Sequence, residues 1–181
     1  MLTACGLAPQ VVPSHYEETL LFPMPPEEMV MFFAMGKAMD VAARMAEDPV
    51  SEDPGLLIIG ADTTVSCEGL IMGKPKDKED GLAMLMPLSG RTHTVTTGVC
   101  LLDVDTHRTL CFYEDTHVTF KEYGEEEISA YLDTDEAYDK AGGYAIQGTF
   151  AKYIESVDGD VDNVIGFPLT RFLKELEKFI K

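Results

Sequence analysis

The run LLIIGADTTV, residues 56–65, ends a continuous apolar stretch on an ionisable side chain, Asp62. A stretch of this kind predicts a strand that is buried on both faces. A buried carboxylate is costly unless it is paired, hydrogen-bonded or bound to a metal ion. Asp62 therefore either satisfies a turn or is there for chemistry.

Further ionisable side chains stand at positions where they could serve the same chemistry. Glu17 and Glu18 follow an apolar segment, and they either meet another carboxylate in one cleft or serve as turn residues. Lys74 belongs to GLIMGKP, which is not a P-loop because the spacing is one residue short and Pro75 replaces the hydroxyl residue that would hold Mg²⁺. Lys74 is either a solvated lysine or a phosphate ligand. The same two interpretations apply to Lys37, which lies close to the apolar face of its predicted helix.

The segment DKAGGYAIQG, residues 139–148, has three glycines around Tyr144 and Gln147. The glycines indicate backbone conformations that other residues avoid, and the amide of Gln147 can read a hydrogen-bonding edge. Functional loops have this composition, and so do tight structural turns. The four His residues lack a metal-binding spacing, and His93 and His117 lie within strand patterns, so we expect no metal role for them.

The composition of the 181 residues is that of an ordinary globular protein, with one domain or two small lobes. The net charge of −18, from 14 basic and 32 acidic side chains, argues against duplex nucleic acid or an anionic membrane as partner. A small anionic ligand is compatible with this charge where local cations and a divalent metal ion surround it. The four widely spaced Cys residues predict reduced thiols and a cytoplasmic location, and no apolar run is long enough to span a bilayer.

The elements that must position these residues follow from the apolar patterns. The sequence predicts helices over 25–47, 77–88, 125–132 and from about 168 onward, with Asp77 as the N-cap of the second. It predicts a loop at 48–55. Strands are expected at 8–14, from 56 and over 150–157, with a short return strand at 70–75 and a hairpin formed by 91–104 and 109–123. Helices and strands alternate with a hairpin between them, so the fold class is α/β (α+β mixed). We expect a sheet with both parallel and antiparallel pairs.

The segments GADTTV (60–65), GKP (73–75), LSGRTHTVTTGV (88–99), DKAGGYAIQG (139–148) and IESVDGDVDNVIGFPL (154–169) occur in the order found in one family. With these motifs the chain resembles the Maf family of nucleoside triphosphate pyrophosphatases over nearly its whole length. The forms ADT, RTH-x-V and AGGY-x-IQG are similar to the branch that acts on dTTP and UTP.

This resemblance implies a twisted mixed sheet flanked by helices, with a cleft between two lobes. It implies hydrolysis of a nucleoside triphosphate to the monophosphate and pyrophosphate with a divalent cation, Mg²⁺ or Mn²⁺, and a homodimer as one candidate assembly. In family terms Asp62 takes the catalytic position, whereas the substrate-binding positions fall on Glu17, Lys37, Thr63, Lys74 and Gln147. An ordinary Asp, with a pKa of about 3.9, is a poor base at neutral pH. We therefore expect Asp62 to act partly as a base and partly by holding metal and orienting water.

One motif of the family, S-x-S-P-R-R, has no counterpart in this sequence. In family members it lies near the N-terminus and binds the triphosphate. The sequence therefore predicts a single Maf-like domain over 1–181 without that first strand and motif. We expect weakened triphosphate binding, because hydroxyls and arginines of this kind form a phosphate clamp. The alternative function is that of a catalytically impaired nucleotide-binding or cell-division regulatory protein.

Overall fold

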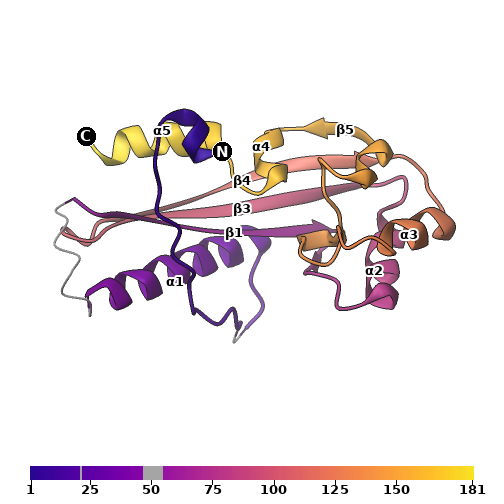
Figure 1. Cartoon of the computed structure of the whole chain (residues 1–181), viewed down its shortest axis with the longest axis horizontal. Coiled ribbons are helices and arrows are strands. Elements are labelled where there is room, and N and C mark those ends of the chain that lie inside the picture. The colour runs from indigo at the N-terminus through magenta and orange to yellow at the C-terminus, as the bar shows by residue number, and fades with distance from the viewer. Residues whose placement is uncertain (21, 47–54) are drawn as a thin grey trace. The chain divides into compact units, whose positions relative to one another are not determined.

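Figure 1 shows the helices and strands, coloured from the N-terminus to the C-terminus. The computed structural model describes residues 1–20, 22–46 and 55–181, so most of the predicted loop at 48–55 lies outside the described residues. The helices are α1 (Pro26–Ala46), α2 (Lys78–Leu85), α3 (Glu125–Leu132), α4 (Val161–Ile165) and α5 (Leu169–Phe179), and the strands are β1 (Leu57–Cys67), β2 (Leu70–Met72), β3 (Thr92–Asp103), β4 (Thr109–Phe120) and β5 (Ile154–Asp158). No helix among the described residues is long and apolar enough to cross a membrane.

The five strands form one sheet in the order β2-β1-β3-β4-β5. β1 pairs antiparallel with β2, and β4 pairs antiparallel with β5. The start of β1 lies beside the end of β3, because the N–H of Val104 donates to the carbonyl of Leu56 at 3.1 Å, and β3 and β4 form the predicted hairpin. The expectation of parallel pairs is therefore wrong for the described part of the chain. The short connections β1–β2 and β3–β4 allow only antiparallel neighbours.

The strand predicted at residues 8–14 is also wrong, because this segment has no regular structure. Side chains of α1 hold it instead of a sheet: Arg44 donates to the carbonyl oxygen of Pro13 at 2.6 Å, and Ser14 donates to Asp40 at 3.1 Å. Pro9 and Pro13 lack the N–H that a strand ladder needs, which explains why β-branched residues between them do not make a strand.

The predicted strand over 150–157 begins later than expected. A 3₁₀ turn occupies Thr149–Tyr153, and β5 follows it. Thr149 is bound through its N–H and its hydroxyl to the carboxylate of Glu136, at 2.8 and 3.2 Å, and this fixes the turn. The helix predicted over 77–88 is confirmed as α2 followed by a 3₁₀ turn, and Asp77 caps it by accepting from the N–H of Asp80.

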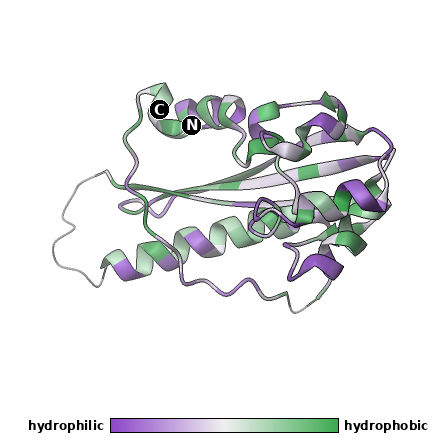
Figure 2. Cartoon of the chain, turned by 45° about the vertical axis from the view of Figure 1, so that its right-hand side comes forward, coloured by the Kyte–Doolittle hydropathy of each residue, from purple (hydrophilic) through white to green (hydrophobic). Residues whose placement is uncertain are grey.

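The chain divides into two compact units, and the first comprises Met1–Asp62, Thr97–Glu114 and Phe167–Lys181. In this unit α1 lies against one face of the sheet and α5 against the other (Figure 1). Figure 2 shows α1 as a mostly hydrophobic ribbon with single hydrophilic residues along it. The α1 face of the core contains Ala34, Ala38, Val41, Ile58, Cys100 and Leu102, and the α5 face contains Val99, Leu101, Phe112, Phe172 and Phe179.

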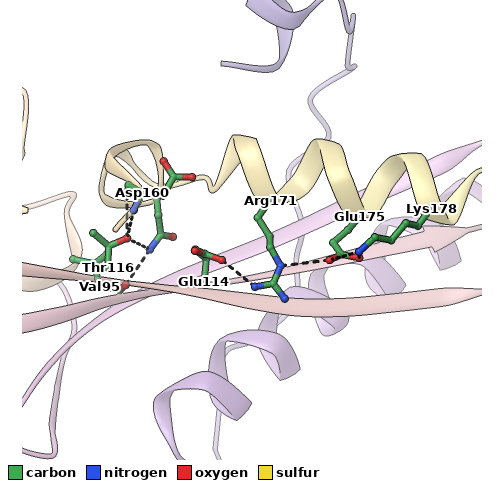
Figure 3. A network of polar contacts seen from close by, with 8 residues as sticks. Val95, Glu114, Thr116, Asp160, Arg171, Glu175 and Lys178 are labelled. Carbon is green, nitrogen blue, oxygen red and sulfur yellow. Dashed lines mark hydrogen bonds and ion pairs between the residues drawn. The ribbon is translucent and has the colours of Figure 1, made fainter. Parts of the chain in front are cut away.

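A chain of ion pairs fixes α5 to the sheet within this unit (Figure 3). Arg171 contacts Glu114 of β4 at 3.1 Å and Glu175, one turn later in α5, at 3.5 Å. Lys178 contacts Glu175 from the following turn at 3.1 Å. Glu114 and Glu175 are 26 % and 17 % exposed, so these contacts are better shielded than ordinary surface pairs.

The second unit comprises Thr63–Thr96 and Asp115–Gly166. Its core is rich in aromatic rings that pack edge to face, with Phe120 and Phe150 completely buried at the centre. The helices α2 and α3 contact each other beside this core, and Gly81 of α2 allows the close approach because a Cβ there would lie 2.6 Å from the side chain of Leu132. Large aromatic rings therefore make up much of the core of this unit.

A buried polar network closes the second unit near α4 (Figure 3). The Thr116 hydroxyl donates to the carbonyl oxygen of Asp160 at 3.0 Å and accepts from the Asp160 N–H at 3.1 Å. The Asn163 amide donates to the carbonyl oxygen of Val95 and to Thr116 Oγ1, at 3.0 and 3.1 Å. These bonds attach the motif VDGDVDN to β3 and β4, since buried polar groups of this kind are costly to separate.

Candidate active site

Lys37, Asp62 and Glu18 form one cluster of charged side chains in the first unit. Lys37 Nζ lies 2.6 Å from Asp62 Oδ1 and 2.7 Å from Glu18 Oε1, and it donates to the carbonyl oxygen of Ala61 at 3.4 Å. The side chains of Lys37 and Asp62 are 23 % and 12 % exposed, and that of Glu18 is 47 % exposed. One ammonium is therefore shared between a largely buried carboxylate and a half-exposed one.

The charge of Lys37 is stable at neutral pH. Burial lowers the pKa of its ammonium, but the hydrogen bonds and charge attraction from Asp62 and Glu18 outweigh burial and raise the pKa above its usual value. The cluster thus brings two carboxyl groups and one ammonium together. Lys37 supplies one positive charge that could attract an anionic substrate.

Glycines on two strands let α1 approach the sheet, and this approach brings Lys37 to Asp62. A Cβ on Gly60 would lie 2.1 Å from the carbonyl oxygen of Ala34, and one on Gly98 would lie 2.4 Å from the backbone of Val30. Because side chains alternate along a strand, Asp62 leaves β1 on the same face as Gly60, toward α1. A glycine inside an apolar strand run is the sequence signal for such close backbone contact.

The early acidic pair contributes through its second member. Glu18 contacts Lys37, whereas Glu17, the residue assigned by resemblance, is exposed, and its backbone carbonyl accepts from the N–H of Thr19 at 2.9 Å. A substrate-binding role for Glu17 stays a prediction. In the sequence Glu18 is one of two adjacent acidic residues, and the residue types alone do not show which of them reaches Lys37.

The other predicted substrate-binding residues, Thr63, Lys74 and Gln147, belong to the second unit. The Thr63 hydroxyl donates to the carbonyl oxygen of Gly166 at 3.5 Å, a long bond that links β1 to the end of α4. Lys74 and Gln147 are exposed. They are more exposed than Lys37 and Asp62, and they are therefore accessible to a ligand.

The segments that carry Lys74 and Gln147 are joined through their backbones. The N–H of Gly142 donates to the carbonyl oxygen of Gly73 at 2.9 Å. Gly142 and Gly143 have φ of +72° and +73°, and a Cβ on Gly142 would lie 2.8 Å from the side chain of Val65. Only glycine combines this left-handed backbone with so little space, so the glycine-rich loop has a defined position next to Lys74.

The same loop is anchored by a contact that the sequence did not reveal. Tyr144 OH lies 2.7 Å from Nε2 of His93 on β3, and the two side chains are 5 % and 1 % exposed. Burial lowers the pKa of His93 to about 4, so the imidazole is neutral at physiological pH. His93 is thus a core residue that holds the Gly-rich loop.

A metal ion is implied by the resemblance, and the donor atoms of the charged cluster suit a hard cation. Among residues 1–20, 22–46 and 55–181, no group of three or more His, Cys, Asp or Glu side chains is close enough to hold a metal ion by itself. Asp62 and Glu18 offer carboxylate oxygens within the same cluster. Mg²⁺ is commonly bound by one or two carboxylates together with water and substrate phosphates, so these residues fit such an ion.

Comparisons with known proteins agree with the motifs. The chain matches the family model of Maf-like proteins over residues 1–179. A dTTP/UTP pyrophosphatase of Bacillus cytotoxicus is 42 % identical over 170 residues, which cover 94 % of this chain and 84 % of the relative. Proteins with the same name from Bacillus anthracis and Caldicellulosiruptor bescii are each 39 % identical, over 99 % and 98 % of this chain and 88 % and 87 % of their own lengths. This chain therefore belongs to the Maf family.

Proposed function

We propose that this chain is a nucleoside triphosphate pyrophosphatase, a hydrolase of acid anhydrides that converts dTTP and UTP to the nucleoside monophosphate and pyrophosphate. The names of the similar proteins support this substrate class. The observation that carries the proposal is the contact of Asp62 with the protonated Lys37 at 2.6 Å, because a shielded carboxylate beside a fixed cation is suited to handling water at an anionic centre.

In the proposed reaction a water oxygen bonds to the phosphorus of the substrate, the bond from this phosphorus to the departing oxygen breaks, and pyrophosphate leaves. Asp62 orients the water and accepts its proton. Lys37 fixes the direction of the Asp62 carboxylate and provides positive charge next to the phosphate chain. Glu18 holds Lys37 from its second side, so the ammonium keeps one position before substrate arrives.

A divalent cation, Mg²⁺ or Mn²⁺, completes the proposal. When bound, it would neutralise phosphate charge and polarise the reacting phosphoryl group. Asp62 and Glu18 are the residues that would hold it. The closeness of two carboxyl groups to one ammonium supports this assignment, because carboxylate oxygens are ligands that such a cation prefers.

Substrate selection is assigned to residues of the second unit. The Gln147 amide has both a donor and an acceptor, which suits the adjacent carbonyl and N–H groups of a uracil or thymine edge. Thr63 assists base selection, and Lys74 contacts the phosphates, with Glu17 as a further binding residue. The exposure of Lys74 and Gln147 supports these roles, since both are open to an incoming ligand.

The test is pyrophosphate release from a panel of dTTP, UTP, dCTP, dATP and GTP, with Mg²⁺ and with Mn²⁺. The chain should release pyrophosphate fastest from dTTP and UTP, and Asp62→Asn should lower kcat by about 100- to 1,000-fold. Asp40→Asn is the matched control, because Asp40 is a carboxylate of α1 that pairs with Arg44 outside the proposed site. Nucleotide binding without turnover would refute the proposal.

The proposal extends to the location and assembly of the protein. A cytoplasmic location suits an enzyme that acts on free nucleotides, and a homodimer is the assembly proposed from the resemblance. Cell fractionation and the mass measured in solution by light scattering test these two points. Neither result alters the expected chemistry of the Lys37 cluster.

A further inference from the structure

Cys100 on β3 and Cys111 on β4 lie opposite each other in the hairpin of the first unit. The N–H of Asp103 donates to the carbonyl oxygen of Arg108 at 2.9 Å, which makes these two residues partners across the strands. Three positions back along β3 and three positions forward along β4, the partners are Cys100 and Cys111. The two thiols are therefore direct cross-strand neighbours.

The register at the other end of the hairpin agrees with this pairing. Thr92 and Thr119 share a hydrogen bond of 2.8 Å between their hydroxyls, and the N–H of Phe120 donates to the carbonyl oxygen of Arg91 at 3.0 Å. These pairs have the same register as Asp103 and Arg108. A bulge between the two ends of the hairpin would have changed the register from one end to the other. Because the register is the same at both ends, Cys100 and Cys111 lie in a continuous part of the pairing.

The position of the pair within the ladder suits a disulfide. Hydrogen-bonded and non-hydrogen-bonded pairs alternate along antiparallel strands, and Asp103 with Arg108 is a hydrogen-bonded pair. Cys100 with Cys111, three positions away, is therefore a non-hydrogen-bonded pair. Such pairs have Cα atoms about 4.5 Å apart, within the range of roughly 4.4–6.8 Å that a disulfide requires.

The two thiols differ in access to solvent. Cys100 is completely buried on the α1 face of the sheet, whereas Cys111 is half-buried at the edge of the same cluster. A hydrogen bond from the Cys100 thiol lowers the pKa of Cys111, although burial acts against this effect. The same contact, together with burial, raises the pKa of Cys100. Cys111 is thus the more nucleophilic and the more accessible sulfur.

We propose that Cys100 and Cys111 form a thiol modification site, which low-molecular-weight disulfides oxidise to a disulfide within the chain. In the first step the Cys111 thiolate attacks one sulfur of the small disulfide, forming a mixed disulfide and releasing one small thiolate. In the second step the Cys100 sulfur loses its proton and attacks Cys111 Sγ, which releases the second small thiol. The two cysteines are oxidised by two electrons, and the small disulfide is reduced to two thiols.

The site has a physical consequence for the first unit. The new bond would link β3 to β4 beneath α1, in the cluster that includes Ala38 and Val41. A cross-link restricts the unfolded chain, so the oxidised protein should unfold at a higher temperature than the reduced protein. Dithiothreitol should reverse both the cross-link and the stabilisation.

The test uses the full chain in a Cys5→Ser background, because Cys5 is exposed and would be modified independently. The probe is oxidised glutathione, and the measurements are intact mass and non-reducing peptide maps. The background chain should lose two hydrogen atoms, retain no glutathione and yield a Cys100–Cys111 cross-linked peptide. Cys100→Ser should retain one glutathione on Cys111, because the second step is removed.

Cys111→Ser is the reciprocal variant, and its modification should be at least about tenfold slower, because Cys100 is buried. The peptide map of the background chain decides the question even where a serine variant does not fold. Glutathione that remains on Cys111 of that chain, unmodified thiols at both positions, or equal reactivity of the Cys111→Ser variant would each overturn the proposal.

Discussion

The two compact units differ in how they hold the side chains that are proposed to act on the substrate. In the first unit Lys37, Asp62 and Glu18 are already paired, and the pairing depends on the close approach of α1 to the sheet. In the second unit Lys74 and Gln147 face solvent, and a buried aromatic core fixes only the segments that carry them. The charged side chains Lys37 and Asp62 are therefore paired in advance in the first unit, whereas in the second unit the core positions the backbone that carries Lys74 and Gln147.

This difference separates two requirements of a hydrolytic site. Side chains that handle water and protons gain most from a fixed geometry, because each misplaced charge raises the barrier. Side chains that recognise a base or screen phosphate charge can complete their contacts when the ligand arrives. We therefore assign the proposed chemistry to the first unit and the proposed selection to the second.

The largest expected effect comes from removing one lysine in each unit. Lys37→Met should lower kcat/KM by about 1,000-fold, equivalent to roughly 4 kcal/mol, since Asp62 and Glu18 lose the cation between them. Lys74→Met should lower it by only about tenfold, mainly through KM, because Lys74 is exposed and its charge is screened. Initial rates of pyrophosphate release over a range of dTTP concentrations measure both effects.

The control for this pair is Lys78→Met, which removes an exposed lysine paired with Asp133 on the surface of the second unit. Surface pairs of this kind contribute little, so its activity should match that of the unmodified chain. Equal losses for Lys37→Met and Lys74→Met would contradict the division of roles between the units.

The second prediction concerns the close approach of α1. Gly60→Ala should destabilise the fold by about 3 kcal/mol, because the added Cβ would meet the carbonyl oxygen of Ala34 at 2.1 Å. Gly73→Ala adds the same atom where nothing lies within 4 Å, so its free energy of unfolding should change by less than about 0.5 kcal/mol. Chemical denaturation of both variants checks the difference. A stable, fully active Gly60→Ala chain would show that Lys37 does not need this packing.

The sequence predicts much of what is local in this fold. The bounds of α2, α3 and the β3–β4 hairpin follow from caps, turns and β-branched runs, and Asp77 is an N-cap as expected. The prediction of a strand at 8–14 is wrong because side chains of α1, which lie far along the chain, bind this segment instead. The prediction of parallel strand pairs is wrong for a related reason, since strand pairing depends on the whole connection and not on any one segment.

The candidate site shows the same limit. Asp62 and Lys37 could be singled out by type and by resemblance, but their contact depends on glycines that act only once α1 meets the sheet. The choice between Glu17 and Glu18 depends on which side chain reaches Lys37. His93 and Tyr144 are 51 positions apart, and neither residue by itself predicts the hydrogen bond that joins them.

The third prediction uses the pH dependence of stability in the second unit. Burial lowers the pKa of His93 from 6.5 to about 4, so between these values the unfolded chain binds a proton that the folded chain does not. The His93 contribution is fully present above pH 6.5 and is lost as the pH falls toward 4, by up to about 3 kcal/mol. His93→Gln should flatten this slope in urea denaturation curves.

The smallest expected effect comes from removing the hydroxyl of Tyr144, which anchors the Gly-rich loop, compared with removing another buried hydroxyl of the same core. Tyr144→Phe removes the hydroxyl that bonds His93, and Tyr123→Phe removes a comparable buried hydroxyl that donates to the carbonyl oxygen of Leu85 at 2.8 Å. Each variant should lose about 1–2 kcal/mol of stability. Only Tyr144→Phe should raise KM for dTTP and UTP, by roughly three- to tenfold with kcat unchanged, because its loop carries Gln147. If Tyr144→Phe instead lowered kcat, the second unit would take part in the chemistry, and the contrast between the units would fail.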